Sequence, residues 1–468
     1  MHSISSSAAL TQGPVGPTLL RMAGPMFIGH LAIVAFNLTD TYFIAGLGTE
    51  SLAAMSYTLP VVMLLYGITF GVGIGTSAVI SRAIGQGDTT QVQRLTTDCL
   101  YLMLILGAVI AGVGLVYLEP MLAFMGATGE PLRQAYVYMF LWMATYPINA
   151  LPMVANNAIR ATGDTRTPGM IMVVAALING LLDPFLIYGW WIFPSLGILG
   201  AAIATVLARF LSTLASLWFL QRKLRMTDWS WPGWKPIAHS WGRILWIGLP
   251  AMATHLLMPI SAGLFTRIAA GFGAAAVAAV GAGSRIDMFA MLAVISLSSV
   301  ALPFVGQNFG AGHWDRIRAG RRFSHKFALA WGAVMAVLFW FAAPRLAGVF
   351  TEDPEVLHLL TLYLRIIPLG YGVLGINMLA CNELNGIHHP LQSTLLNAIR
   401  TVLIFVPLAW LGGRWFGVWG ILAGATAANF LAGAISELML QYTFQRTDPG
   451  RAAPTESGTL LGDAAATS

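Results

Sequence analysis

Charged side chains are scarce in this chain of 468 residues: Asp, Glu, Lys and Arg make up 9% of it, against 57% for the hydrophobic residues. Soluble domains carry about 25% charged residues, so this composition cannot cover a surface exposed to water. The apolar runs reach 20 residues or more and lack the alternating polar pattern of barrel strands. They therefore predict membrane-spanning helices, and the expected fold class is an all-α polytopic membrane protein.

Cysteine and enzyme motifs are also rare or missing. Cys99 and Cys381 are the two cysteines, far apart and in apolar surroundings, so the sequence indicates neither a disulfide nor a metal site. HExxH, GxSxG and Walker A motifs do not occur, which argues against an enzyme embedded in the membrane. The first twenty residues are small and polar, without the pattern of a signal peptide.

Twelve spans are predicted, six on each side of a polar linker at 222–242. In the first half the spans are 18–45, 53–81, 95–118, 132–158, 168–192 and 197–221. In the second half they are 243–270, 277–305, 324–348, 356–381, 391–411 and 416–442. The chain thus divides into an N-terminal segment 1–17, an N-lobe 18–221, the linker, a C-lobe 243–442 and a tail 443–468 of disordered composition.

Basic residues gather in the loops that follow even-numbered spans. Loops after odd-numbered spans clearly hold only Arg133, Arg345 and Arg414, whereas the even-numbered loops include Arg82, Arg160 and Arg316. Because basic loops stay in the cytoplasm, we expect the even-numbered loops and both termini on that side. This distribution explains the net charge of +6 without a nucleic-acid partner.

The two halves repeat. Pro25 in AGPMFIGH lies 225 positions before Pro250 in GLPAMATH, and the glycine pairs Gly46/Gly48 and Gly271/Gly273 recur at the same offset. At a slightly shorter offset, RATGDTRTP answers NELNGIHHP. Two six-helix halves inserted in the same direction form a parallel repeat, related by an axis along the membrane normal. A substrate cavity is expected between them.

Span 1 carries one carboxylate, Asp40, and one proline, Pro25. A charge at the bilayer centre costs about 2.5–3.5 kcal/mol on insertion scales, so such a residue predicts a functional site. A proline removes a helix hydrogen bond and supplies a place to bend. Asp40 is thus our candidate for the energy-coupling residue of a secondary transporter, with Pro25 as its hinge.

Ordered motifs along the chain resemble one known family. They are TDTYFIAGLGTESLAAMS in span 1, AIGQGD after span 2, AIRATGDTRTP before span 5, NGLLDPFLIYG in span 5, GILGAAIAT in span 6 and FVGQNFGAGHWDR after span 8. In their order and spacing the chain resembles the multidrug and toxic compound extrusion (MATE) transporters. The resemblance implies two pseudo-symmetric six-helix lobes and an antiporter that expels cationic, often aromatic compounds in exchange for H⁺ or Na⁺.

The resemblance also implies site residues. It places Asp40 with Asn179 and Asp183 in an N-lobe ion-coupling site, which would take H⁺ or, alternatively, Na⁺. Asn179 and Asp183 are four positions apart and share a helix face. Supporting polar partners are expected at Tyr138, Asn156 and Asn157. Span 7, from Gly248 to Ala270, contains no acidic residue, so the chain resembles the branch that couples through the N-lobe aspartates alone.

Several C-lobe residues are candidates for the substrate cavity. They are Met252, His255, Met258, Asp287, Met288 and Met291. Flexible sulfur side chains adapt to varied ligands, although packing explains the methionines equally well. For Asp287 a local charge pair with Arg285 is the alternative reading, and for His255 neutral packing.

These expectations define a cation-coupled efflux antiporter of the bacterial inner membrane. We expect it to be a monomer among membrane lipids, with no cofactor beyond the coupling ion. Within the transporters the alternative is a lipid-linked saccharide flippase, which would need several cations inside its cavity. The intramembrane cations Arg209, Arg365 and Arg400 are few for that role.

Overall fold

The computed structural model describes residues 9–448, and every regular element in that range is helical. The N-terminal half forms α1 (Val15–Ala45), α2 (Thr49–Gly85), α3 (Thr89–Phe124), α4 (Gly129–Ala144), α5 (Tyr146–Asn149), α6 (Leu151–Ala161), α7 (Arg166–Tyr188) and α8 (Ile198–Trp218). The C-terminal half forms α9 (Trp234–Ala270), α10 (Ala274–Ala290), α11 (Leu292–Gly310), α12 (Trp314–Phe350), α13 (Pro354–Ile366), α14 (Tyr371–Gly386), α15 (Pro390–Ala398) and α16 (Val406–Thr447). Short 3-10 and π turns complete it: η2 (Ala9–Thr11), η3 (Phe219–Lys223), η4 (Ile367–Gly370) and η5 (Ile399–Phe405).

The helices confirm the predicted two-lobed, twelve-span membrane fold. Ten helical segments of the described chain are long and apolar enough to cross a membrane. An eleventh span is the pair formed by α4 and residues 146–161, which meet at a bend of 65°. The segment 390–447 counts as one of the ten but supplies two spans, because Gly417 at φ 64° breaks α16.

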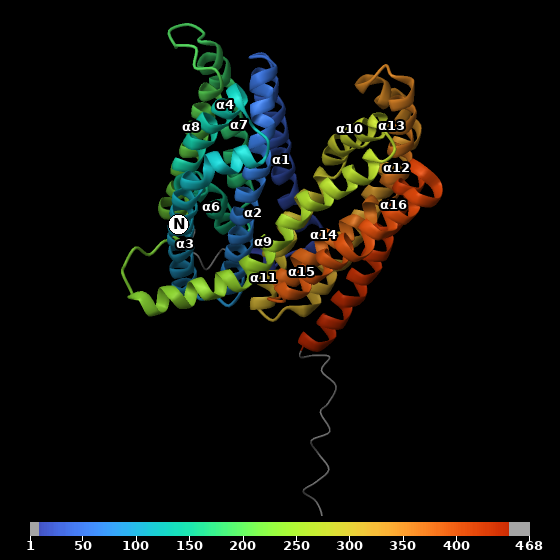
Figure 1. Cartoon of the computed structure of the whole chain (residues 1–468). Helices are drawn as coiled ribbons and strands as arrows, with labels where there is room; N and C mark the ends of the chain where they lie inside the picture. The colour runs from blue at the N-terminus through green and yellow to red at the C-terminus, as the bar shows by residue number, and fades with distance from the viewer. Residues whose placement is uncertain (1–8, 449–468) are drawn as a thin grey trace, which may run out of the picture.

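Figure 1 shows the halves as two lobes that converge at one end and spread apart at the other. Contacts between the lobes come from α2 against α9 and α11, and from α1 against α11 and α12. At the converging end α2 and α11 touch through glycine: a Cβ on Gly310 would lie 2.2 Å from the Arg82 carbonyl oxygen, and one on Gly85 2.0 Å from that of Gln307. Only glycine permits backbones to approach so closely.

The internal repeat appears in the backbone. Pro25 lies inside α1 and Pro250 inside α9. After these helices, Gly48 at φ 112° and Gly273 at φ 101° lie immediately before α2 and α10. Positive φ favours glycine, so the paired glycines make equivalent turns in the two lobes.

Two boundaries differ from the expectation. Helix α9 already begins at Trp234, so the second part of the predicted linker 222–242 is helical. Helix α16 runs on to Thr447, past the expected start of the tail at 443. Residues 1–8 and 449–468 lie outside the described residues, and so does most of the predicted tail.

Candidate functional site

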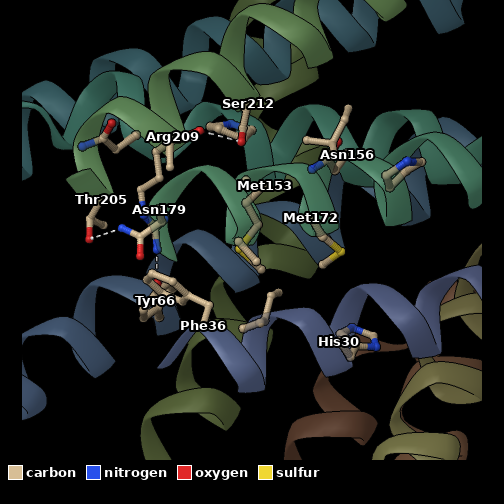
Figure 2. Close-up of a pocket in the computed structure, with 18 of the residues that line it drawn as sticks. His30, Phe36, Tyr66, Met153, Asn156, Met172, Asn179, Thr205, Arg209 and Ser212 are labelled. Carbon is tan, nitrogen blue, oxygen red and sulfur yellow. Dashed lines mark hydrogen bonds between the residues drawn. The ribbon is translucent and has the colours of Figure 1, made fainter. Parts of the chain in front are cut away.

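A cavity of about 380 Å³ lies inside the N-lobe, among residues of α1, α2, α5, α6, α7 and α8 (Figure 2). This is a volume typical of ligand pockets. Its wall is mostly apolar or amide-bearing, and none of its residues is Asp or Glu. The expected place for a substrate cavity was between the lobes, but every residue that lines this cavity belongs to the N-lobe.

Helix α1 presents one face to the cavity. Met26, His30, Ile33 and Asn37 are spaced by three or four residues and all line it, as residues on one helical face do. All of them follow Pro25. His30 also reaches the C-lobe, since its Nδ1 lies 3.1 Å from the Ser296 hydroxyl.

Arg209 of α8 enters the cavity wall from one side. Its guanidinium bonds the Tyr66 hydroxyl and lies 5.2 Å from the ring centroids of both Tyr66 and Trp142. Stacking on aromatic faces holds the guanidinium by cation–π attraction. The side chain is fixed in direction while part of it remains available to the cavity.

Arg160 of α6 enters the same wall (Figure 2 shows the neighbouring Asn156 and Met153). Its Nη2 donates to Asn157 Oδ1, and its Nε is buried without a hydrogen-bond partner in the described chain. Gly73 of α2 makes room for Asn157, because a Cβ there would lie 2.6 Å from Asn157 Nδ2. From the sequence, Arg160 was expected in a cytoplasmic loop and was not predicted as a residue of the site. Its spacing of three from Asn157 was the available signal.

The predicted ion-coupling residues come together just behind the wall. Asp40 of α1 is 7% exposed and Asp183 of α7 is 0% exposed, and their charges interact. The Asn179 amide, with its nitrogen toward Asp183, donates to Oδ2 at 3.0 Å while its oxygen accepts from the Thr205 backbone N–H at 3.1 Å. Asn179 itself lines the cavity, so its amide connects the cavity wall with the Asp183 carboxylate.

One oxygen of each carboxylate accepts no hydrogen bond in the described chain. Asp40 Oδ1 and Asp183 Oδ1 are buried without a hydrogen-bond partner in the described chain. A buried unpaired carboxylate is costly, and binding a proton or a cation would relieve that cost. Whether the site takes H⁺ or Na⁺ stays a prediction.

The three supporting residues take different places. Asn156 and Asn157 line the cavity, and Asn156 Oδ1 accepts from the Ser216 hydroxyl at 3.1 Å. Tyr138 is 5% exposed and does not line it, but its phenol lies within the electrostatic reach of Asp40 and Asp183. A network role for all three stays a prediction.

The C-lobe candidates lie elsewhere, and none whose side chain is described lines this cavity. His255 stacks on Phe70 with ring centroids 4.9 Å apart, and Met252 packs against Gly71, so both sit in the contact between α9 and α2. Met291 is buried and Met288 is exposed. The side chain of Met258 lies outside the described residues.

Asp287 binds tyrosines. Its Oδ2 accepts from the Tyr363 hydroxyl at 2.6 Å and its Oδ1 accepts from the Tyr371 hydroxyl. Gly283, one turn earlier, makes room for the Tyr363 ring. No ion pair between Asp287 and Arg285 occurs among the described residues, so the local charge pair considered from the sequence does not form.

In the part of the chain that the structure describes, no group of three or more His, Cys, Asp or Glu residues is arranged to hold a metal ion. Two six-helix lobes in a membrane, with a ligand-sized cavity and two buried carboxylates beside it, define a multi-pass transporter of small molecules.

Similarity to known proteins identifies the family of this chain. The MatE family model matches residues 25–185 and 250–411, one stretch in each lobe, and each match begins at the repeated helix proline. The chain belongs to the MATE family of transporters, which are not enzymes.

Relatives cover nearly the whole chain. The chain is 38% identical over 424 residues to a protein of Shewanella oneidensis named FAD transporter, covering 91% of this chain and 94% of the relative. It is 25% identical to the multidrug export protein MepA of Staphylococcus aureus, covering 92% and 94%. Among solved structures, the Vibrio cholerae MATE transporter VcmN in its bent form superposes with a TM-score of 0.89 at 33% identity, covering 95% of this chain and 99% of that one.

Proposed function

We propose that this protein exports an aromatic anion of the flavin dinucleotide type from the bacterial cytoplasm, in exchange for H⁺ or Na⁺. One observation carries the proposal: the cavity wall contains Arg160 and Arg209 and no carboxylate. A planar guanidinium matches a phosphate through two parallel hydrogen bonds. A wall with two such groups favours a phosphate-bearing cargo over a cation.

The rest of the wall suits aromatic rings. Phe36, Tyr66 and Phe70 offer ring faces, and the amides of Asn149, Asn156 and Asn157 offer donors and acceptors for ring edges. A flavin dinucleotide combines aromatic ring systems with a pyrophosphate. The Shewanella relative named FAD transporter supports this choice, since it shares 38% identity along nearly the entire chain.

Cationic drugs, which the sequence analysis predicted, are the second candidate. The buried carboxylates Asp40 and Asp183 favour them, and so do the relatives named multidrug export proteins. A cation in the cavity would have to reach those carboxylates past Asn179, with two arginines in the same wall. A lipid-linked saccharide shares the pyrophosphate, so it is tested beside the flavin.

Coupling is proposed to act through α1. Ion binding at Asp40 removes a buried charge, and α1 can then bend at Pro25. The face formed by Met26, His30, Ile33 and Asn37 lies between these two residues, so bending would move it relative to the cavity and change cargo affinity. Exchange requires the ion and the cargo to favour different conformations of the protein. Because the coupling acts through the movement of α1, it does not depend on the charge of the cargo.

Transport in proteoliposomes tests the proposal. FAD, ethidium and a lipid-linked pyrophosphoryl saccharide are offered under an imposed pH gradient or an imposed sodium gradient. We expect FAD export by the wild type, reduced at least about tenfold in Arg160→Gln and in Arg209→Gln, because losing one partner of a buried charge contact costs 2 kcal/mol or more. Arg414→Gln, at an exposed position of α16 in the C-lobe, is the control.

The outcomes separate cargo from coupling. Wild-type export of ethidium without FAD would establish the cationic cargo instead, and movement of the saccharide alone would establish the flippase. Export that needs neither gradient would refute the antiport. Comparing the two gradients identifies the coupling ion.

A further inference from the structure

Three titratable side chains from three helices meet inside the C-lobe. They are His325 of α12, Glu383 of α14 and Glu437 of α16. His325 Nδ1 lies 3.1 Å from Glu437 Oε2, and His325 Nε2 lies 3.5 Å from Glu383 Oε2. Glu383 is 1% exposed, whereas the Glu437 side chain is 36% exposed. None of the three belongs to the coupling site or the cargo cavity.

The two contacts of His325 need one proton more than a neutral imidazole carries. A neutral imidazole has one N–H and one acceptor nitrogen, yet a carboxylate oxygen faces each nitrogen of His325. Nε2 of His325 and Oε2 of Glu383 are both buried and have no other hydrogen-bond partner in the described chain. A neutral ring can donate to only one of the two carboxylates, so the other ring nitrogen then faces a carboxylate oxygen lone pair to lone pair. One more proton, on the ring or on that carboxylate, turns this contact into an attraction.

Charged side chains on α12 connect the cluster with the N-terminal end of this helix. Asp315, Arg318, Arg321 and His325 follow one another on α12 at spacings of three or four, which places them along one face. Arg318 pairs with Asp315, which is 96% exposed, and with Asp448. Arg321 pairs with Glu437. A row of charged groups therefore leads from an exposed carboxylate to a fully buried one.

The charged neighbours of the cluster are few. Arg321 is the cation that contacts it, and Gln441 donates to Glu437 Oε1 at 2.9 Å. Arg322 and Lys326 of the same helix are exposed. Of the helices packed on α12, only α14 and α16 contribute titratable groups to His325 within ion-pair distance in the described chain; α1, α11 and α13 contribute none.

We propose that Glu383, His325 and Glu437 form a proton-binding site of the C-lobe, loaded from the cytoplasmic surface, with the added proton held on His325 between the two carboxylates. Chains of Glu, Asp and His inside a membrane protein commonly carry protons. The site is separate from Asp40 and Asp183, so it adds a second exchangeable proton to the transport cycle. In that respect it rests on the proposed function, because a second coupling proton requires ion-coupled export.

Stoichiometry tests the role in transport. Protons moved per FAD are measured in proteoliposomes for the wild type, Glu383→Gln and the control Glu352→Gln, an exposed acid beyond α12. Glutamine keeps the size of the side chain and cannot titrate. We expect Glu383→Gln to export with one proton fewer per cargo and the control to match the wild type. An unchanged stoichiometry in Glu383→Gln would overturn the proposal and leave a purely structural ion pair.

A direct measurement keeps the site separable from the transport proposal. In full-length protein with ¹⁵N-labelled histidine, the His325 signals are assigned by their loss in His325→Gln. We expect imidazolium signals from both ring nitrogens at neutral pH in the wild type and loss of one of these protons in Glu383→Gln. A His325 ring with a single N–H in the wild type, beside an unprotonated Glu383, would overturn the proton site.

These two measurements fail independently. If the wild type shows no ion-driven export at all, the proposed function is wrong, and the histidine spectrum alone decides whether the proton site exists. If Glu383→Gln does not fold, the wild-type spectrum and the conservative variant Glu437→Gln still decide it.

Discussion

At the level of single residues, the site separates charge by sign. Arg160 and Arg209 belong to the cavity wall, while Asp40 and Asp183 lie behind Asn179. In the proposed function, the wall would meet a cargo anion while the carboxylates bind the coupling ion, so that one lobe would serve both sides of the exchange.

Replacing Asp40 by Asn tests the division. The carboxylate is 7% exposed and its Oδ1 has no hydrogen-bond partner in the described chain, so a neutral amide of the same shape should stabilise the fold by on the order of 1 kcal/mol. We expect Asp40→Asn to raise the Tm in detergent, to abolish gradient-driven export and to keep FAD binding. Glu50→Gln, at an exposed position, is the control. Normal gradient-driven export by Asp40→Asn would show that the residue is structural.

His388, in the loop between α14 and α15, should make the folded protein less stable in acid. Burial, followed by the charges of Arg82 and Arg243, lowers the pKa of His388 to about 4, against about 6.5 for an unperturbed histidine. As pH falls from about 6.5 to about 4, the unfolded chain binds a proton that the folded chain refuses, so the free energy of unfolding decreases.

His388→Asn should remove part of this decrease. Asn tolerates the positive backbone angle at this position, φ 65°. The measurement is Tm against pH for both proteins, from about pH 7 down to about pH 5. Parallel curves would mean that His388 does not contribute to the loss of stability.

At the level of elements, α1 joins the hinge, the cavity face and the carboxylate in one helix. Pro25 has no N–H for the Arg21 carbonyl, and its own carbonyl oxygen faces α7, where a Cβ on Gly169 would lie 2.6 Å away. We expect Pro25→Ala to bind FAD within about twofold of the wild type and to export it at least about tenfold more slowly, because a regular helix resists bending. Binding is measured by flavin fluorescence and export in proteoliposomes. Unchanged export would remove Pro25 as the hinge.

The sequence predicted the elements better than the cavity. Runs of apolar residues define spans without knowledge of packing, and the repeat of Pro25 at Pro250 predicted the two lobes. Asp40 was recognisable because a polar residue inside a span is costly, whereas Asn179 and Asp183 followed from the family resemblance. Arg160 was not, because a long side chain near a span end reads as a loop cation. Its direction depends on Asn157 and Gly73, which belong to different helices.

The C-lobe shows the same limit. His255 repeats His30 in sequence, yet it stacks on Phe70 of the other lobe whereas His30 lines the cavity. Asp287 accepts hydrogen bonds from two tyrosines, Tyr363 and Tyr371, whose helices follow much later in the chain. Sequence position fixes the depth of a residue in its span, and partners on other helices fix its role.

At the level of the whole molecule, the converging end is closed by more than the glycine contact of α2 with α11. Residues 10–13, just before α1, bind the C-lobe: the Leu10 carbonyl accepts from Asn308 Nδ2 and from Arg316 Nη2, both at 3.1 Å. Arg316 also donates to the carbonyls of Gln12 at 2.9 Å and Gly13 at 2.7 Å. On the N-lobe side, the Ala161 carbonyl accepts from Gln307 Nε2 at 2.7 Å. Opening this end requires these bonds to break.

Arg316→Ala should therefore shift the molecule toward a conformation open at this end. It removes four hydrogen bonds of a charged donor, three of them to the carbonyls of residues 10–13. Losing about 2 kcal/mol changes the ratio of two conformations roughly 30-fold. Spin labels at the exposed positions Thr90 of α3 and Arg322 of α12 report the separation of the lobes, and we expect a longer distance to gain population. Lys326→Ala, an exposed residue of the same helix, should leave the distance distribution unchanged. Identical distributions in Arg316→Ala and the wild type would show that the Arg316 bonds do not hold this end closed, since the glycine contact and the bonds made by Gln307 and Asn308 are untouched by the substitution.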